Sequence, residues 1–332
     1  MKIAFDGACC GDGPITGVAR AFLNGLAAYA ASFPGDAVLL LPIGAPAPAL
    51  PGVDIVPAPR GALRRQLGLP RLLRQLRAEV LHSAVAAVPL RAPCPTIATA
   101  HDLPWLHPEL GEASTPWRRF VVRRALAAAS AVIAPSAFTA HDVRRLLGPR
   151  GPRLVLVPHG TTLGQAPDAT TTQARSGPFV ALGDDRPRKN RAIVQAAHAA
   201  ARAKCPDLPP LRFVGPPHDY VEEAEKVRLL QTCRAVVQGS RFEGFGMPVL
   251  EALAHGAPVV CADIAPFREI AGDAALFADP RDPEAIAAAL IRIHTDAPLR
   301  WRLAESGHQR AVLAQPTTVA LAWRELHERL RR

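Results

Sequence analysis

The chain has 332 residues, of which 49% are hydrophobic and 20% charged, a balance that excludes a disordered protein and allows two domains with full cores. No stretch of about 18 uninterrupted apolar residues occurs, so no membrane-spanning helix is expected. Residues 1–160 hold 17 Lys and Arg against 9 Asp and Glu, a net of +8, whereas residues 161–332 hold 22 against 20. With few aromatic residues and no nucleic-acid-binding motif, this basic half favours an anionic lipid or a phosphorylated substrate over nucleic acid.

The first half of the chain alternates strand and helix signals. It starts with a strand over Lys2–Asp6, which reaches an acidic residue at once and so differs from a signal peptide. Further strands are expected over Ala37–Leu41, Asp54–Pro57, Val80–His82, Thr96–Thr99, Ala131–Ala134 and Leu154–Pro158, and helices over Val18–Ala31, Leu63–Arg77 and Arg118–Ala129, with Ser136 as a further helix cap. This alternation predicts a parallel, doubly wound sheet.

The Leu63–Arg77 helix combines an apolar stripe with flanking arginines. Leu69 and Leu73 lie on the stripe, and Arg71 and Arg74 stand beside it. A half-buried surface helix is the simpler interpretation. Its cations also favour transient contact with anionic lipid.

A linker is expected over Thr161–Pro178, which is rich in Thr, Gly, Ala and Pro and has no apolar period. After it the pattern restarts, with strands expected over Phe179–Leu182, Leu211–Val214, Ala235–Val237 and Pro258–Cys261, and helices over Ala192–Lys204, Val221–Thr232 and Ala285–His294. We therefore expect an N-terminal domain over residues 1–165, a C-terminal domain over residues 166–316, and a last helix over residues 317–332 that can cross back to the first domain. The two domains would meet at a cleft lined by the carboxyl ends of their strands.

Two features exclude common cofactor sites. The six cysteines show no C-x-x-C spacing, so we expect reduced cytosolic thiols and predict no metal site. The segment Gly11-Asp-Gly-Pro-Ile-Thr-Gly17 is one residue too long for the G-x-G-x-x-G dinucleotide fingerprint, and the strand ending at Pro42 lacks the acid that would hold a ribose. A nicotinamide site is therefore not expected, while a phosphate-facing Gly17 and a plain tight turn both stay open.

The most informative segment runs from Ser240 to Val260. Two carboxylates, Glu243 and Glu251, stand on either side of a Gly-Phe-Gly-Met-Pro turn, and Pro248 reads as the first residue of a helix that Gly256 ends. Free N–H groups at such a helix start form an anion site, and carboxylates on both sides accept hydrogen bonds from hydroxyls. These features fit a nucleotide-sugar; the alternative is an ordinary strand–loop–helix with two solvated glutamates.

Two further segments lie where expected strands end. His101 follows the strand Thr96–Thr99, where a ligand role competes with a structural one. Arg188 and Lys189 precede a helix whose macrodipole disfavours cations at its N-terminus, so a bound anion between them is a reasonable cause. The competing interpretation is a solvated loop.

Together these segments resemble the retaining glycosyltransferases of the GT4 type, which have the GT-B architecture of two facing Rossmann-like domains. The similar segments run from Thr16-Gly-Val-Ala-Arg20 through Thr99-Ala-His-Asp-Leu103, Arg186-Pro-Arg-Lys-Asn190 and Glu243-Gly-Phe-Gly-Met-Pro-Val-Leu-Glu251 to Gly272–Pro280. The resemblance implies an α/β fold of two such domains with the second one shortened, because a strand–helix unit usual in the family is missing between Gly215 and Arg234.

The resemblance also implies roles for single residues. Glu243 would hold hydroxyls of the donor sugar and support positive charge at its anomeric carbon, and Glu251 would bind the ribose. Lys189 would neutralise the leaving diphosphate, and His101 would contact the sugar. The remaining donor-binding positions are Gly17 and the cations Arg186 and Arg188 near the diphosphate, and Phe245, Gly246, Met247 and Pro248 along the sugar and diphosphate.

The implied activity is that of a retaining, metal-independent hexosyltransferase with no cofactor beyond its nucleotide-sugar donor. It would act on a glycan or lipid-linked acceptor in cell-envelope or exopolysaccharide biosynthesis, in the cytoplasm and peripherally on the inner face of the membrane. By family likeness alone, the donor would carry mannose on a guanosine base. Two alternatives stay open: a non-catalytic nucleotide-sugar-binding protein and a nucleotide-sugar epimerase.

Overall fold

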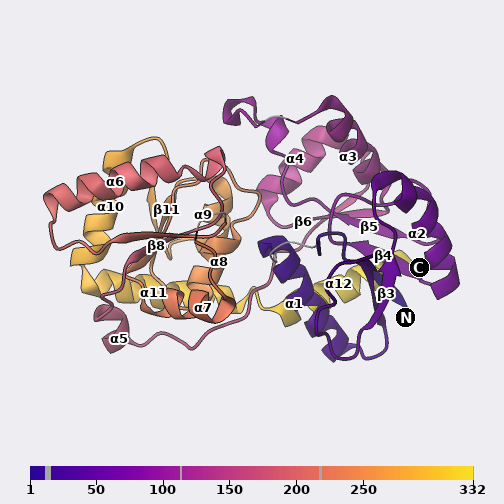
Figure 1. Cartoon of the computed structure of the whole chain (residues 1–332), viewed down its shortest axis with the longest axis horizontal. Helices are drawn as coiled ribbons and strands as arrows, with labels where there is room; N and C mark the ends of the chain where they lie inside the picture. The colour runs from indigo at the N-terminus through magenta and orange to yellow at the C-terminus, as the bar shows by residue number, and fades with distance from the viewer. Residues whose placement is uncertain (12–15, 113, 217–218, 332) are drawn as a thin grey trace. The chain divides into compact units, whose positions relative to one another are not determined.

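A computed structural model describes residues 1–11, 16–112, 114–216 and 219–331. The chain divides into two compact units: unit 1 comprises Met1–Gly160 and Pro316–Arg332, and unit 2 comprises Thr161–Gln315. Each unit is built on its own parallel sheet with helices on both faces (Figure 1). The first boundary between the units follows Gly160, whereas the composition predicts it after residue 165. The last helix belongs to unit 1.

Unit 1 contains a seven-stranded parallel sheet in the order β3-β2-β1-β4-β5-β6-β7. Its strands are β1 (Ile3–Asp6), β2 (Ala37–Pro42), β3 (Asp54–Ala58), β4 (Val80–Ser83), β5 (Thr96–Thr99), β6 (Ala131–Ala134) and β7 (Arg153–Leu156). Its helices are α1 (Gly17–Ser32), α2 (Ala62–Leu76), η1 (Pro104–Leu106), η2 (Pro108–Leu110), α3 (Pro116–Ala128), α4 (Ala137–Leu147) and α12 (Pro316–Arg331). The expected alternation of strands and helices is confirmed, with bounds that differ by a few residues.

The strands β1, β2, β4, β5 and β6 are buried on both faces, because their side chains alternate between two faces that are each covered by helices. α1 and α12 cover one face, around Phe5, and α2, α3 and α4 cover the other, around Leu81 and Val132. α12 lies directly on α1: a Cβ added at Gly25 would come within 2.6 Å of the Trp323 ring. The C-terminal helix is thus part of the core of unit 1.

Unit 2 contains a five-stranded parallel sheet in the order β12-β11-β10-β8-β9. Its strands are β8 (Phe179–Leu182), β9 (Leu211–Val214), β10 (Ala235–Gln238), β11 (Val259–Ala262) and β12 (Leu276–Ala278). Its helices are α5 (Ala169–Gln173), η3 (Pro187–Lys189), α6 (Arg191–Lys204), α7 (Glu223–Thr232), α8 (Met247–Ala254), α9 (Ala265–Ala271), α10 (Pro283–Thr295) and α11 (Ala297–Val312). α6 and α10 pack on one face, and α7, α8 and α9 on the other.

The segment expected to be a linker is part of unit 2. Asp168 accepts from Thr171 N (2.9 Å) and starts α5 inside it. Arg175 is buried and donates to the carbonyls of Leu230 (2.8 Å) and Gly256 (3.0 Å). The composition did not predict that this segment packs into unit 2, because polar contacts at helix ends hold it and no apolar stripe is present.

Between β9 and β10 the described residues form only an isolated bridge at Gly215 and helix α7. The sequence interpretation that an additional strand–helix unit is missing here therefore agrees with the described part of the fold. None of the helices in the described ranges combines the length and the apolar character that a membrane crossing requires.

Candidate active site

The candidate site of unit 2 lies at the carboxyl-terminal edge of its sheet. In a parallel sheet these ends lie on one edge, so the loops after β8 and β10 are neighbours because the two strands pair. A cavity between them is lined by Gly183 and Asp184 from the first loop, Lys189, and Gln238 and Gly239 from the second.

Glu243 and Lys189 form a nearly buried ion pair at this edge. Lys189 Nζ donates to Glu243 Oε1 over 2.7 Å, and the two side chains are 11% and 9% exposed. The same carboxylate oxygen accepts from Ser240 Oγ over 2.8 Å. The site therefore offers one ammonium and one carboxylate side by side, both fixed by the protein and both largely removed from water.

Backbone contacts hold the two loops together. Asn190 has a left-handed backbone (φ 60°), and its Nδ2 donates to Gly239 O (3.0 Å) and Pro280 O (2.7 Å). Arg241 N donates to Arg188 O over 2.8 Å. Lys189 is thus tied to the Glu243 loop from both sides. α6 starts at Arg191, so the cation pair precedes that helix, as expected.

The turn before α8 requires glycine. Gly246 has φ 123°, which other residues adopt only with strain, and an added Cβ would lie 2.7 Å from the Phe267 ring. α8 starts at Met247, one residue before the expected start at Pro248, and Gly256 (φ 64°) follows its end. The helix directs its positive N-terminal end toward the carboxyl edge of the sheet.

Glu251 lies one turn into α8 and also has a lysine partner. Its Oε2 is 3.0 Å from Lys226 Nζ on α7, and the side chains are 10% and 13% exposed. Lys226 also contacts Glu223 at 3.1 Å. No sequence pattern indicates Lys226, because its neighbours along the chain carry no motif and only the packing of α7 beside α8 brings it to Glu251.

The other two predicted cations take different places. Arg186 is exposed and forms a two-point contact with Asp184, with Nε and Nη2 at 3.0 and 2.7 Å from Oδ2. Arg188 is buried, and its guanidinium lies over the Phe242 ring, 5.7 Å from its centroid. Of the three predicted cations, Lys189 is the one that the described structure brings to Glu243.

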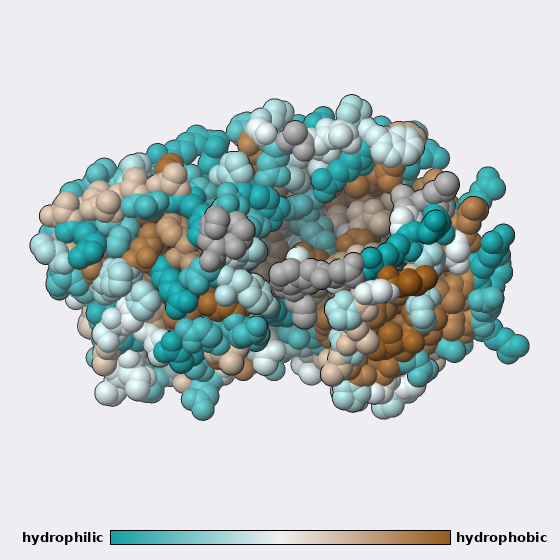
Figure 2. All heavy atoms as spheres, in the orientation of Figure 1, coloured by the Kyte–Doolittle hydropathy of each residue, from teal (hydrophilic) through white to brown (hydrophobic). Residues whose placement is uncertain are grey.

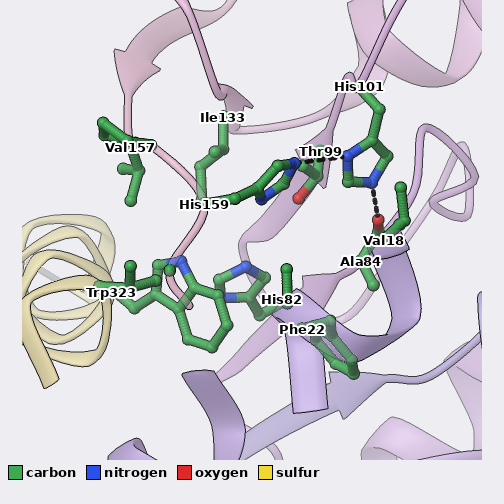
Figure 3. A pocket seen from close by; sticks show the side chains of 14 residues that line it. Val18, Phe22, His82, Ala84, Thr99, His101, Ile133, Val157, His159 and Trp323 are labelled. Carbon is green, nitrogen blue, oxygen red and sulfur yellow. Dashed lines mark hydrogen bonds between the residues drawn. The ribbon is translucent and has the colours of Figure 1, made fainter. Parts of the chain in front are cut away.

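In unit 1, His101 lies in a second pocket beside a histidine that the sequence interpretation missed (Figure 3). His101 Nε2 donates to Ala84 O over 2.6 Å, so Nδ1 accepts from His159 Nε2 over 3.1 Å. The rings stack with centroids 5.0 Å apart. The position of His159 just after β7, at the same sheet edge as His101, is the signal that could have identified it.

Both histidines of this pair are kept neutral. Burial lowers the pKa of His101, and burial together with His101 lowers that of His159 well below its usual value. His82 and Trp323 line the same pocket, so α12 contributes to it as well. Gly17 is exposed at the start of α1, where Thr16 accepts from Ala19 N (3.2 Å); residues 12–15 of the predicted glycine turn lie outside the described residues.

Two family models match the chain, one in each unit. "Glycosyltransferase Family 4" matches residues 29–165, and "Glycosyl transferases group 1" matches residues 218–310, which include Glu243 and Glu251. The chain belongs to the GT4-type glycosyltransferases. Lys189 lies outside both matched ranges, whereas His101 and His159 lie within the first.

Relatives of this GT4-type chain share part of its sequence. The O-antigen chain mannosyltransferase B of Escherichia coli is 40% identical over 92 residues, 28% of this chain and 23% of that protein. Glycogen synthase of Mycobacterium tuberculosis is 35% identical over 101 residues, 30% of this chain and 23% of that protein. The matches thus span about a quarter of the length of these relatives.

Solved structures show that the fold is GT-B. Sucrose-phosphate synthase from Thermosynechococcus elongatus superposes with a TM-score of 0.77 at 19% identity, over 99% of this chain and 98% of that one. HepE from Anabaena, in complex with UDP and glucose, superposes with a TM-score of 0.71 at 17% identity, over 99% and 100%. At these identities the likeness concerns the fold alone.

Proposed function

We propose that this chain is a retaining, metal-independent glycosyltransferase. It moves a hexose from a nucleotide-sugar to a glycan or lipid-linked acceptor in cell-envelope or exopolysaccharide biosynthesis. The observation that carries the proposal is the buried Lys189–Glu243 pair at the carboxyl edge of the unit 2 sheet. The similarity to an O-antigen mannosyltransferase supports a polysaccharide product, and mannose is the sugar we would test first.

The chemistry follows from fixed charges. As the sugar–phosphate bond breaks, negative charge collects on the leaving diphosphate and positive charge on the anomeric carbon. Lys189 and the N-terminal end of α8 stabilise the first, and Glu243 stabilises the second while accepting hydrogen bonds from sugar hydroxyls. In this proposal the fixed cations do the work that a metal ion performs in other transferases, and the nucleotide-sugar is the sole co-substrate.

Glu251 is assigned to the ribose. Its carboxylate can accept from both ribose hydroxyls while Lys226 holds one of its oxygens. Backbone groups of Phe245, Gly246, Met247 and Pro248 would line the sugar and diphosphate. The roles of Gly17, Arg186, Arg188 and His101 stay predictions; for His101 a sugar contact requires the ring to give up a bond to Ala84 or His159.

We further propose that unit 1 touches an anionic membrane surface from the cytoplasm, and that α3 makes the main contact. Trp117 and Phe120 on α3 are 72% and 54% exposed, and their rings stack with centroids 5.8 Å apart. Arg123 and Arg124 follow on the same helix, which carries no acidic residue. Exposed aromatics beside arginines are typical of helices that lie in the membrane interface.

Two other surfaces of unit 1 are less suited to contact with an anionic membrane. The sequence predicts the membrane contact on the helix α2, which exposes Leu67 and three arginines. Its residues Leu69 and Pro70 are buried and so are not available to a membrane. Figure 2 shows hydrophobic side chains gathered on the lower part of unit 1 around β3, a region where Ile43 and Ile55 are exposed beside few cations. Charge complementarity to an anionic surface favours α3.

A donor screen tests the activity. The protein is incubated with GDP-, UDP- and ADP-sugars and a lipid-linked or glycan acceptor, and release of nucleoside diphosphate is measured. The proposal expects release that depends on both donor and acceptor, with retention of anomeric configuration in the product, and unchanged turnover in the presence of a chelator. Binding without turnover by any donor, or conversion of the donor sugar without acceptor, would contradict it.

A further inference from the structure

Three metal-ligand side chains meet in unit 2 away from the candidate active site. They are Cys205, Asp207 and His294, whose ligand atoms all lie within 4.8 Å of one another. Asp207 Oδ1 is 3.0 Å from Cys205 Sγ, and its Oδ2 is 3.1 Å from His294 Nε2. The chain shows no zinc-type spacing because His294 stands 87 positions after Asp207, and only the packing of α10 against α6 brings them together.

This cluster lies at the amino-terminal edge of the sheet. Cys205 is the C-cap residue of α6, which starts beside the Lys189 loop, and His294 lies in the last turn of α10. At about 1.5 Å per residue, the 14 residues of α6 separate the cluster from that loop by about 21 Å. A ligand bound here would not touch the donor.

The chemistry of the three groups selects a cation of the zinc class. Thiolate, imidazole and carboxylate are the ligands that zinc takes in proteins, and zinc is tetrahedral with ligand distances of about 2.0–2.3 Å. Tetrahedral ligands at those distances are about 3.3–3.8 Å apart, so the observed separations of 3.0 and 3.1 Å need only small shifts. Three protein ligands leave a fourth position for water.

Two of the three ligands are held in place before any ion binds. His294 is 9% exposed, and its Nδ1 has no hydrogen-bond partner among the described residues, so the polar contacts of the ring are all on the Nε2 side. Cys205 is fixed by its own N–H to Ala201 O (2.8 Å) and by Leu208 N to its carbonyl (3.0 Å). Asp207 is 79% exposed and can adjust.

Electrostatics favour occupancy by a cation. A thiolate and an ionised carboxylate 3.0 Å apart repel each other, and a divalent cation bound between them removes that repulsion. The positive charge of Arg234 disfavours a bound cation, since Arg234 also interacts with the charge of Asp207.

We propose that Cys205, Asp207 and His294 form a binding site for a zinc-class divalent cation that joins the ends of α6 and α10. The ion stabilises unit 2 and takes no part in sugar transfer. The proposal does not rest on the proposed function, because its readouts are metal binding and stability.

The test uses Co²⁺ as a spectroscopic probe on chelator-treated, reduced full-length protein. We expect a thiolate-to-cobalt charge-transfer absorption that Zn²⁺ abolishes by competition, and a rise in melting temperature with Zn²⁺. Cys205→Ser removes the absorption, and His294→Gln weakens Zn²⁺ binding by at least about 10-fold. Cys94→Ser is the matched control, because Cys94 is another half-buried free cysteine and should leave binding unchanged.

Asp207→Asn covers the case in which the other variants fold poorly, since this exposed side chain can be changed without disturbing the core. It should keep the melting temperature of the metal-free protein and lose most of the increase with Zn²⁺. Absence of a charge-transfer band in the parent protein, or a band that persists in Cys205→Ser, would show that the three residues are a hydrogen-bonded group only. Donor turnover is measured in parallel, so failure here and failure of the transferase assignment are separate results.

Discussion

Lys189 and Glu243 are 54 positions apart in the chain, yet their charged ends lie 2.7 Å apart at one edge of the unit 2 sheet. The pair is nearly buried, and burial of an ion pair by itself contributes little to stability because both charges must leave water. An ammonium and a carboxylate held in this way are instead well placed to meet a ligand that carries hydroxyls and phosphate together.

Removing either partner should abolish transfer. Lys189→Met removes the cation that faces the leaving diphosphate, and Glu243→Gln removes the charge that supports the anomeric carbon while leaving an acceptor for Ser240. A fixed electrostatic contact of this kind is worth about 10²–10³ in kcat, so each variant should lose at least that much. Release of nucleoside diphosphate and the initial rate of product formation are the measurements.

The matched control is Lys204→Met, which breaks an exposed Lys–Glu pair with Glu284 in the same unit. It should change neither kcat nor melting temperature noticeably, because exposed pairs contribute about 0–1 kcal/mol. A broken buried pair costs about 3–5 kcal/mol, so melting temperatures must accompany the rates. Full activity in a folded Glu243→Gln protein would remove the basis of the assignment.

The second pair should affect binding more than chemistry. Glu251→Gln and Lys226→Met leave the Lys189–Glu243 pair intact but disturb the carboxylate assigned to the ribose. We expect the KM for the donor to rise by about 10-fold with a small change in kcat, since the ribose contact is the same in ground and transition states. Glu305→Gln, a change at an exposed carboxylate of α11, serves as the control.

The sequence predicted the site residues that lie close together along the chain, and it missed those that only the fold brings together. Glu243, Gly246 and Glu251 belong to one short segment, so their spacing along a turn and a helix was visible. Lys226 reaches Glu251 through helix packing, which no local pattern encodes, and His159 reaches His101 because both residues follow strands of one sheet. The helix α11 was not predicted either, because it is rich in arginine and is positioned by contacts with α8 and α5.

Local sequence patterns also predicted the two sheets better than they predicted the side-chain contacts in the loops. The alternation of apolar strands and amphipathic helices gave both parallel sheets, because buried parallel strands are continuously apolar. The resemblance places the Arg186 cation near the diphosphate, and in the structure the Arg186 guanidinium pairs with Asp184, two residues earlier. Side-chain pairing at short range within a loop depends on backbone turns that the residue pattern alone does not determine.

Gly246→Ala should damage the site through the backbone. A residue with a Cβ is strained at φ 123°, and the added atom would lie 2.7 Å from the Phe267 ring, so α8 must shift at its N-terminus. We expect a loss of about 2–4 kcal/mol in the stability of unit 2 together with a higher KM for the donor. Gly11→Ala has open space around it and should be neutral. Equal melting temperatures for the two variants would contradict the argument.

Membrane contact through α3 has a direct test in vesicle co-sedimentation. Trp117→Ser with Phe120→Ser should lower the partition coefficient by about 10-fold or more on vesicles that contain phosphatidylglycerol. Arg123→Gln and Arg124→Gln should each lower it by about fivefold at low ionic strength and less in high salt. Leu313→Ser, at a residue of unit 2 that is 76% exposed, is the control for loss of a surface apolar group. Binding that is equal on neutral vesicles, or unchanged in the α3 variants, would rule this surface out.

Buried histidines should make unit 1 sensitive to acid. His327 Nε2 lies 3.0 Å from His82 Nδ1, its Nδ1 is 3.2 Å from Tyr29 Oη, and burial with the nearby Arg324 lowers its pKa to about 3. The unfolded chain binds a proton near pH 6.5 and the folded chain does not, so stability is full above that pH and falls as the pH drops toward 3. This group alone should remove about 2 kcal/mol between pH 7.5 and pH 5.

The measurement is denaturant unfolding at both pH values, followed by tryptophan fluorescence, to which Trp323 beside His82 contributes. His327→Phe will be less stable at pH 7.5, because Tyr29 and His82 lose a partner, but its stability should fall by about 2 kcal/mol less on acidification than that of the parent. His141→Phe, at an exposed position of α4, should keep the parental pH dependence. If His327→Phe also keeps it, the acid sensitivity does not come from His327 and lies with other groups, such as Asp36, because a carboxylate with a lowered pKa also loses its stabilising charge in acid.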